Sequence, residues 1–437
     1  MVKNIFASSH LLTYLQDFDT SDSLSVGLVL GQTCDGKDYI VHMAKSPSLP
    51  PKKLRNLSDV NDLWLADHAK QATKMLSGGM YVIGIFVASE TDLVTSFPTN
   101  LKAVLLQLSK SLSTEYLHGN TSSNEKIVIN YCSKSKLVKC KLYDPIKSIV
   151  KPAEINFCDD NKWIRLECKY EIEKNYFWEE ESPEMDLKEQ MNVVLKDVRK
   201  NLKLSVILFD GEFKPEDECL ELVGKQKKIS KSERSSYENS NQDSRPIIVQ
   251  ILEETTDESS DIIIKDIKSQ IKVVGQITST VWMNPRASYK MASNAIVEDI
   301  LRSLSTRLEM HWDSLIEEEH REDSNSIHEP PRRVMITIPG TEITVSDYLF
   351  PGEGAEEAKT SVEEILDIKL AGLPDEIQEV EGFIDITSYE GNISQIAEGK
   401  ISKNDKEYSH KLFIIGLIFA LLVLVVSIIV HSVLKNS

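Results

Sequence analysis

The sequence contains few of the patterns that carry catalytic or metal chemistry. Its six cysteines include no C-x-x-C pair, so a zinc ribbon or a dense disulfide framework is not expected. None of the nine histidines lies in an H-x-H, H-E-x-x-H or H-x-x-E-H motif, and no Walker, Rossmann or G-x-S-x-G motif is present. Lys and Arg number 50 against 68 Asp and Glu, and the net charge of −18 argues against a nucleic-acid partner. We therefore expect a protein that is not an enzyme and uses no metal or cofactor.

Two side chains keep an enzymatic alternative open. His68 lies beside Asp67 in a predicted helix, but a catalytic base needs a nucleophile, and the sequence identifies none. Cys34 lies near a predicted hairpin turn, with no helix N-terminus or base to activate its thiol. We therefore interpret His68 as an ordinary helix residue and the cysteines as reduced thiols.

One long apolar run is present, from Leu412 to Val430, and its 19 residues include no charge. About 20 apolar residues in a helix cross the hydrocarbon layer of a bilayer, so the run predicts a single transmembrane helix. Only seven residues follow it, which predicts a tail anchor. The small excess of basic residues on its upstream side predicts a body in the cytosol. Because the run is strongly apolar and its tail only weakly basic, we expect the endoplasmic reticulum membrane.

The N-terminal region, residues 1–150, alternates strand and helix signals. A strand-like run at 24–30 and another at 38–43 flank Asp35-Gly36, which predicts a hairpin. A helix with Ser58 as its capping residue then continues to Gly78-Gly79, and an apolar strand follows at 80–87.

The rest of the chain divides by composition. Residues 151–223 form a less distinctive α/β segment, and 224–245 form a polar linker that lacks core-forming side chains. Residues 246–351 predict a second α+β domain, with a long helix at 288–316 and a hairpin around Pro339-Gly340. Residues 352–411 predict a flexible acidic tether, because fifteen acidic and five basic residues lie between Glu353 and Glu407.

Glycines bound the first predicted strands. Gly27 and Gly31 lie near the two ends of one strand, and Gly78-Gly79 precede the next. Glycine in or beside a strand indicates close approach of another part of the backbone. One interpretation is tight packing of strand on helix, and the other is a groove that receives a partner.

Several short segments resemble the odorant response abnormal protein four family, and together they extend over nearly the whole chain. The matching residues are Gly27-Leu-Val-Leu-Gly31-Gln32, Lys37-Asp38-Tyr39, Trp64-x-x-x-His68-Ala69, Met75-Leu-x-Gly78-Gly79, Gly84-x-Phe86, Arg333-Val334, Ile338-Pro339-Gly340 and Asp347-Tyr348. The resemblance implies a membrane-anchored accessory protein that supports folding and ciliary delivery of odorant receptors of the seven-helix class. It also implies an endoplasmic reticulum partner, the cysteine protease that removes ubiquitin-fold modifier.

The N-terminal order of elements also resembles the MPN domain. Active MPN proteases carry an H-x-H motif just after a strand that begins G-x-[WF], but here Gly84-Ile-Phe86 is followed by Val87-Ala88-Ser89. This resemblance implies a pseudoenzyme without a zinc site. The expected fold class is therefore α+β, with an MPN-like α/β N-terminal domain, a second α+β domain and a single C-terminal transmembrane helix.

These observations predict a non-catalytic, tail-anchored adaptor that recruits and positions the ubiquitin-fold-modifier protease or supports receptor trafficking. The alternative is a chaperone-like factor that binds seven-helix receptors directly. Expected partners are the protease, seven-helix receptors and the lipid bilayer, without nucleic acid. The predicted partner-binding residues are Gly27, Leu28, Gly31, Gln32, Trp64, His68, Gly78 and Gly79.

Overall fold

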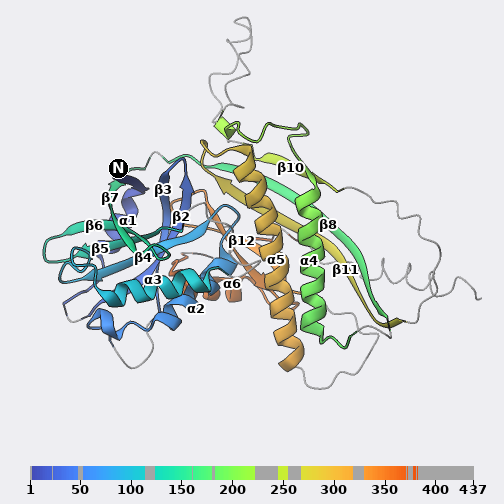
Figure 1. Cartoon of the computed structure of the whole chain (residues 1–437), viewed down its shortest axis with the longest axis horizontal. Helices are drawn as coiled ribbons and strands as arrows, with labels where there is room; N and C mark the ends of the chain where they lie inside the picture. The colour runs from blue at the N-terminus through green and yellow to red at the C-terminus, as the bar shows by residue number, and fades with distance from the viewer. Residues whose placement is uncertain are drawn as a thin grey trace, which may run out of the picture. The chain divides into compact units, whose positions relative to one another are not determined.

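A computed structural model shows the arrangement of the folded body (Figure 1). It describes residues 2–21, 23–47, 53–113, 124–159, 161–179, 183–221, 245–253, 267–317, 329–370, 372, 377–379 and 381. The chain divides into two compact units, Met1–Gly382 and Phe383–Ser437, and every described residue belongs to the first.

Seven strands of the N-terminal part close into a barrel, in the order β1-β3-β2-β4-β5-β6-β7. The strands are β1 (Lys3–Ala7), β2 (Ser25–Cys34), β3 (Lys37–Lys45), β4 (Tyr81–Ser89), β5 (Lys126–Cys132), β6 (Leu137–Asp144) and β7 (Ile149–Phe157). Strand β1 closes the barrel because it pairs in parallel with both β3 and β7. Leu11 and Leu15 of helix α1 (Ser9–Gln16) join the apolar cluster that the barrel strands form.

The hairpin predicted at Asp35-Gly36 is confirmed by the antiparallel pairing of β2 with β3. Asp35 and Gly36 have φ values of 51° and 70°, the left-handed conformation that a tight two-residue turn requires. The register of the pair shifts between Leu30 and Gly31, which pair with His42 and Ile40, so Val41 of β3 is the extra residue of a bulge.

Helices α2 (Asp62–Met75) and α3 (Thr99–Ser111) pack on the outside of the barrel. Leu65, Ala69 and Ala72 give α2 the apolar face that the sequence predicts. The predicted cap is wrong, because the side chain of Asn61 accepts the hydrogen bond from the Trp64 amide. Ser58 lies in a preceding 3₁₀ turn, η1 (Leu57–Asp59).

A second sheet has the order β11-β8-β10-β9 and carries two helices on one face (Figure 1). Its strands are β8 (Ile164–Glu179), β9 (Val206–Phe209), β10 (Ile247–Leu252) and β11 (Ile267–Met283). Apolar side chains of α4 (Leu187–Leu204) and α5 (Tyr289–Glu317) share one core with this sheet. The long helix predicted at 288–316 is therefore confirmed as α5.

A third, three-stranded sheet follows α5 and has the order β13-β12-β14. Strands β12 (Arg332–Thr337) and β13 (Thr344–Leu349) form the predicted hairpin, with Gly340 at a φ of 77°, and β14 (Ile377–Glu379) pairs with β12. Helix α6 (Ala355–Leu366) buries one side against the core that also contains α2. A bridge between Leu76 and Val345 joins the end of α2 to β13.

The MPN-like fold class predicted from the resemblance is wrong. The N-terminal strands form a closed seven-stranded barrel, in a chain that combines six helices with three sheets among its described residues. From the hairpin to β4, the order of elements along the chain matches the prediction, but closure of the barrel depends on β1 and β7. Those two strands lie about 150 residues apart, so no local pattern indicates that they pair.

The part expected to be a second domain and a tether also differs from the prediction. Residues up to Gly382 form one compact unit, and Trp282 of β11 lies in the same core cluster as the barrel residue Leu28. Helix α6 begins at Ala355, inside the stretch expected to be flexible. Its buried residues Ala358, Val362 and Leu366 recur every four positions, which is the spacing that gives a helix an apolar face.

The predicted membrane span from Leu412 to Val430 lies outside the described residues. Within the part of the chain that the structure describes, no helix has the length and apolar character needed to cross a membrane.

Candidate functional site

Gln32, one of the predicted partner-binding residues, joins three parts of the fold through its carboxamide. Its side chain is 1% exposed. The Nε2 group donates to the carbonyl of Gly79 at 2.8 Å and to the carbonyl of Trp282 at 3.0 Å, while Oε1 accepts from the amide of Asn284 at 2.8 Å. The barrel strand β2, the turn after α2 and the end of β11 are therefore held together by one side chain.

The adjacent Gly78-Gly79 turn extends the second sheet toward the barrel. The amide of Gly78 donates to Thr280 at 3.1 Å, and its carbonyl accepts from Trp282 at 3.0 Å. A Cβ atom on Gly78 would lie 2.4 Å from Cγ2 of Val281, and one on Gly79 would lie 2.6 Å from the Trp282 carbonyl. Gly79 also has a φ of +80°, so both positions require glycine.

The other predicted residues of β2 lie in the interior as well. A Cβ atom on Gly27 would lie 2.2 Å from the Ala44 carbonyl, and one on Gly31 would lie 2.0 Å from the Tyr39 carbonyl. Leu28 is fully buried in the core under α2 and α3. The close approach at Gly27 and Gly31 is thus to the backbone of the neighbouring strand β3, not to a helix as one interpretation of the glycine pattern held. The partner-binding role of these residues stays a prediction.

Trp64 and His68, on α2, belong to a second interior contact. His68 is 7% exposed, and its Nδ1 lies 2.9 Å from Oγ of Ser46 while its Nε2 lies 2.7 Å from the carbonyl of Ile365. Because a carbonyl can only accept, Nε2 carries the proton and Nδ1 accepts from the serine hydroxyl. The half-buried Trp64 ring stacks on the imidazole at 6.4 Å. Both ring nitrogens of His68 are therefore hydrogen-bonded inside the protein.

The same interior contact holds the C-terminus of α6. His42 of β3 donates from Nε2 to the carbonyl of Leu366 at 2.8 Å, and Tyr14 of α1 donates to Asp367 at 2.7 Å. His42 and His68 thereby satisfy carbonyl groups that a helix end leaves without intrahelical partners, while Tyr14 binds the carboxylate of the residue that follows the helix. Burial lowers the pKa of both histidines, and this effect outweighs that of the hydrogen bonds to the α6 carbonyl groups, which raise the pKa. The neutral imidazole is thus the form that binds α6.

A buried ionic network that our sequence analysis missed joins α5 to the third sheet. Asp299 and Arg333 are both fully buried and form two hydrogen bonds, of 2.8 and 2.9 Å. Ser279 of β11 donates to the same carboxylate at 2.7 Å. Arg333 also donates to Ser346 of β13 at 3.2 Å. The pair therefore links β11, α5, β12 and β13 in one place.

Glu381 extends this network from the end of the described chain. Its carboxylate accepts from Arg307 at 2.6 Å, from the Thr278 amide at 2.9 Å and from the Arg333 amide at 2.8 Å. It is only 8% exposed, although the acidic composition around it predicts a solvated tether. One signal was available, because Asp299, Arg302 and Thr306 form a polar stripe along a helix whose opposite face is apolar.

The thiol considered as a nucleophile has an inactivating environment. Burial and the nearby Asp35 raise the pKa of Cys34 to about 11, so the thiolate is scarce at neutral pH. The residues that the structure describes contain no group of three or more His, Cys, Asp or Glu side chains placed to hold a metal ion.

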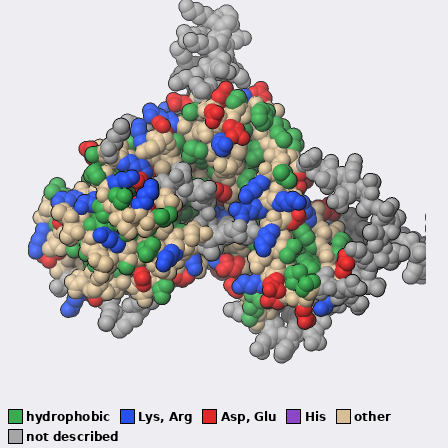
Figure 2. Space-filling view, in the orientation of Figure 1, with side chains coloured by type: hydrophobic (Ala, Val, Ile, Leu, Met, Phe, Trp, Pro, Cys, Tyr) green, Lys and Arg blue, Asp and Glu red, His purple; other side chains and the backbone are tan. Residues whose placement is uncertain are grey.

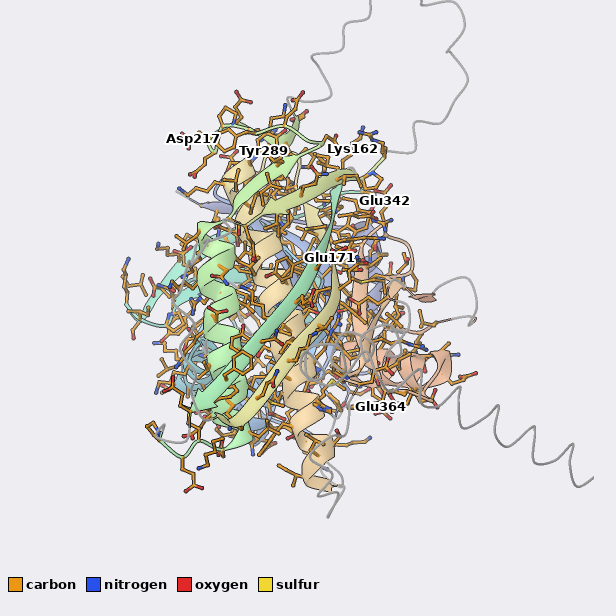
Figure 3. All side chains as sticks on the ribbon, turned by 90° about the vertical axis from the view of Figure 1, so that its right-hand side faces the viewer. Lys162, Glu171, Asp217, Tyr289, Glu342 and Glu364 are labelled. Atoms are coloured by element: carbon orange, nitrogen blue, oxygen red, sulfur yellow. The ribbon has the colours of Figure 1, made fainter. Side chains whose placement is uncertain are left out.

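Exposed apolar side chains gather instead on the outer face of β9 and β10. Val206 is 47% exposed, Ile248 45% and Leu252 53%, and Val206 and Leu252 lie directly opposite each other in the strand pair. Their neighbours Phe209 and Val249 point into the core with α4 and α5, so this column faces away from those helices. On the same face, β8 carries charged residues such as Glu171 (Figure 3). We call Val206, Ile248 and Leu252 the apolar column.

The family model described as odorant response abnormal 4-like matches residues 27–377. The protein odr-4 homolog of Mus musculus is 27% identical over 357 residues, covering 78% of this chain and 77% of its own, and that of Drosophila melanogaster is 27% identical with full coverage of both chains. Odorant response abnormal protein 4 of Caenorhabditis elegans is 24% identical over 79% of this chain and 72% of its own.

One solved structure resembles the chain at low sequence identity. The crystal structure of UfSP from C. elegans aligns with a TM-score of 0.41 and 8% identity, covering 84% of this chain and 57% of that one.

Proposed function

The chain belongs to the odorant response abnormal 4-like family, and we propose that it is a non-catalytic adaptor on the endoplasmic reticulum membrane. In this proposal the described body binds the cysteine protease that removes ubiquitin-fold modifier. The apolar run from Leu412 to Val430 holds the complex at the membrane with the body in the cytosol. Confinement raises the effective concentration of the protease near membrane-bound substrates, so later encounters become local.

The apolar column is the observation that carries this proposal. Three exposed aliphatic side chains on one sheet face offer a surface that a protein partner can bury. Most of the residues first expected to bind a partner are interior, and three of them, Gln32, Gly78 and Gly79, join the barrel to the second sheet. Their contribution in this account is rigidity, because a body that keeps one shape loses less entropy when it binds.

A paired pull-down tests the proposal. Full-length protein carrying Ile248→Asp and Leu252→Asp is purified in mild detergent from cells, beside the unchanged protein and an Ile146→Asp control. Ile146 is 71% exposed on the barrel, so the control also replaces an exposed apolar side chain. We expect the protease to co-purify with the unchanged protein and the control, and to be lost from the double variant. Equal recovery with all three proteins, or with none, would contradict the proposal.

Direct support of seven-helix receptors is the second candidate function. The names of the relatives, which refer to the odorant response, favour it. It predicts that receptor maturation depends on this protein even in cells whose modifier pathway is disabled. The adaptor proposal predicts that removing the protein has no further effect in such cells.

A further inference from the structure

Helix α4 exposes a row of basic side chains that the proposed function does not use. Lys188, Lys196, Lys200 and Lys203 are exposed, and Arg199 is half-buried beside them. At 3.6 residues per turn these five positions fall within an arc of about 120° around the helix axis. We call these five residues the basic stripe. Figure 2 shows Lys and Arg side chains gathered over the region where Figure 1 draws α4.

The acidic residues of α4 do not pair with the four lysines of this stripe. Glu189 closes the capping box by accepting from the Asp186 amide at 3.1 Å. Asp197 accepts from Tyr176 of β8 at 2.9 Å and lies 3.7 Å from Lys174, so it faces the sheet. Among the described residues, none forms an ion pair with any of the four lysines. A chain with a net charge of −18 thus carries a concentrated positive face.

Two apolar side chains border the stripe. Leu204 is 66% exposed at the C-terminal end of α4, and Val193 is 37% exposed near its middle. By helical spacing Leu204 lies about one turn from Lys200, and Val193 lies about two turns from it on the same side of the helix. Lysines beside exposed aliphatic groups are the combination found in helices that lie on the surface of an anionic bilayer. An acidic protein partner would be bound by the lysines alone and would not require the neighbouring aliphatic side chains.

We propose that the basic stripe of α4 contacts the anionic headgroups of the membrane that holds the chain. This inference rests on the proposed membrane location and deepens it, because it fixes how the body is turned. The apolar column lies on the opposite face of the same sheet, since α4 packs on the inner face and Val206 and Leu252 point outward. With α4 on the bilayer, the apolar column faces the cytosol, where a soluble protease can reach it.

Lysine footprinting on the full-length chain tests the inference. The protein is reconstituted into vesicles of phosphatidylcholine alone and of phosphatidylcholine with about 30% phosphatidylserine, floated through a density gradient, and acetylated briefly. Mass spectrometry then gives the acetylation rate of each lysine. Lys169 is the internal control, because it is exposed on β8 and points to the opposite face of the sheet. A third sample adds soluble polyglutamate to the neutral vesicles.

We expect acetylation of Lys196, Lys200 and Lys203 to slow at least about threefold in the anionic vesicles relative to the neutral ones, with Lys169 unchanged. Flotation with both vesicle types but no such protection would overturn this inference and leave the membrane anchor standing. Protection together with flotation only in anionic vesicles would support the stripe and contradict the anchor. Flotation with neither type would contradict both. Equal protection in neutral vesicles would indicate that the stripe binds a second copy of the chain. Stronger protection by polyglutamate would indicate that it binds an acidic protein. Either result would overturn the inference.

Discussion

The Gln32 carboxamide and the Trp282 carbonyl lie 250 residues apart in the chain and meet at 3.0 Å inside the protein. This contact joins the barrel to the end of the long β11 strand. The contact thereby joins two regions into one folded body, although the sequence predicts that they are separate domains.

Replacing Gln32 should therefore loosen this junction. Gln32→Leu keeps the volume but leaves the Asn284 amide and the Gly79 and Trp282 carbonyls without their partner. We expect a loss of about 2–4 kcal/mol in the free energy of unfolding, because each buried polar group without a partner costs about 1–3 kcal/mol. Urea denaturation measures it, with Gln250→Leu as the exposed control on β10. A similar midpoint for both variants would show that Gln32 holds nothing together.

Two glycines with the same backbone angle separate steric clash from backbone strain. Gly79 and Gly211 have φ values of +80° and +79°, but only at Gly79 would a Cβ atom meet a neighbour, the Trp282 carbonyl at 2.6 Å. Gly211→Ala should cost about 1–2 kcal/mol from the left-handed conformation alone. Gly79→Ala should cost at least about 1 kcal/mol more, as for other overpacked interiors. Equal losses of melting temperature would refute a tight junction.

The buried pair of Asp299 and Arg333 should be costly to break. Asp299→Asn leaves a buried guanidinium without its carboxylate, and we expect about 3–5 kcal/mol of destabilisation. The double variant Asp299→Leu with Arg333→Met should lose less, because no unpaired charge remains. Glu216→Gln breaks the exposed pair with Lys290 and should change stability by about 1 kcal/mol or less. An Asp299→Asn variant that loses no more stability than this control would contradict the importance of the network.

Mild acid should release α6. The pKa values of His42 and His68 are lowered in the folded protein, so the unfolded state binds protons more readily. The contribution of the two histidines to stability is therefore complete above about pH 6.5 and is lost as the pH falls through their folded pKa values. Hydrogen exchange of the α6 amides, corrected for the intrinsic pH effect, should show weaker protection at pH 5.5 than at pH 7.5.

A variant that lacks His42 and His68 isolates this effect from a carboxylic acid that also faces α6. Burial raises the pKa of Asp347 to about 6, so its contribution changes with pH in the opposite direction. In the double variant His42→Gln with His68→Gln the acid-induced loss of α6 protection should disappear. An unchanged loss would assign it to groups other than the two histidines.

Much of the local structure follows from sequence, because its signals are local. Asp35-Gly36 predicts the hairpin, apolar spacing predicts α2 and α5, and Gly78-Gly79 marks the point where backbones meet. Barrel closure has no such signal, since it depends on a parallel pairing between β1 and β7.

The interior site was only partly predictable for a related reason. Gln32 is chemically ordinary, and its importance arises from acceptors and a donor supplied by distant segments. Glu381 is buried although the sequence around it is acidic, because Arg307 and two backbone amides donate hydrogen bonds to its carboxylate. Composition alone does not reveal such partners. The glycine pattern correctly indicated close packing, whereas the exposed column on β9 and β10 was not singled out.

The most direct test of the adaptor proposal is the distribution of the ubiquitin-fold-modifier protease between membranes and cytosol. Cells that lack this protein are compared with cells that express the full chain or a chain ending before Leu412, and the two fractions are quantified by immunoblot. We predict that the protease sediments with membranes only when the full chain is present, and that it stays soluble with the truncated chain. A protease whose distribution is the same in all three cell lines would contradict the account.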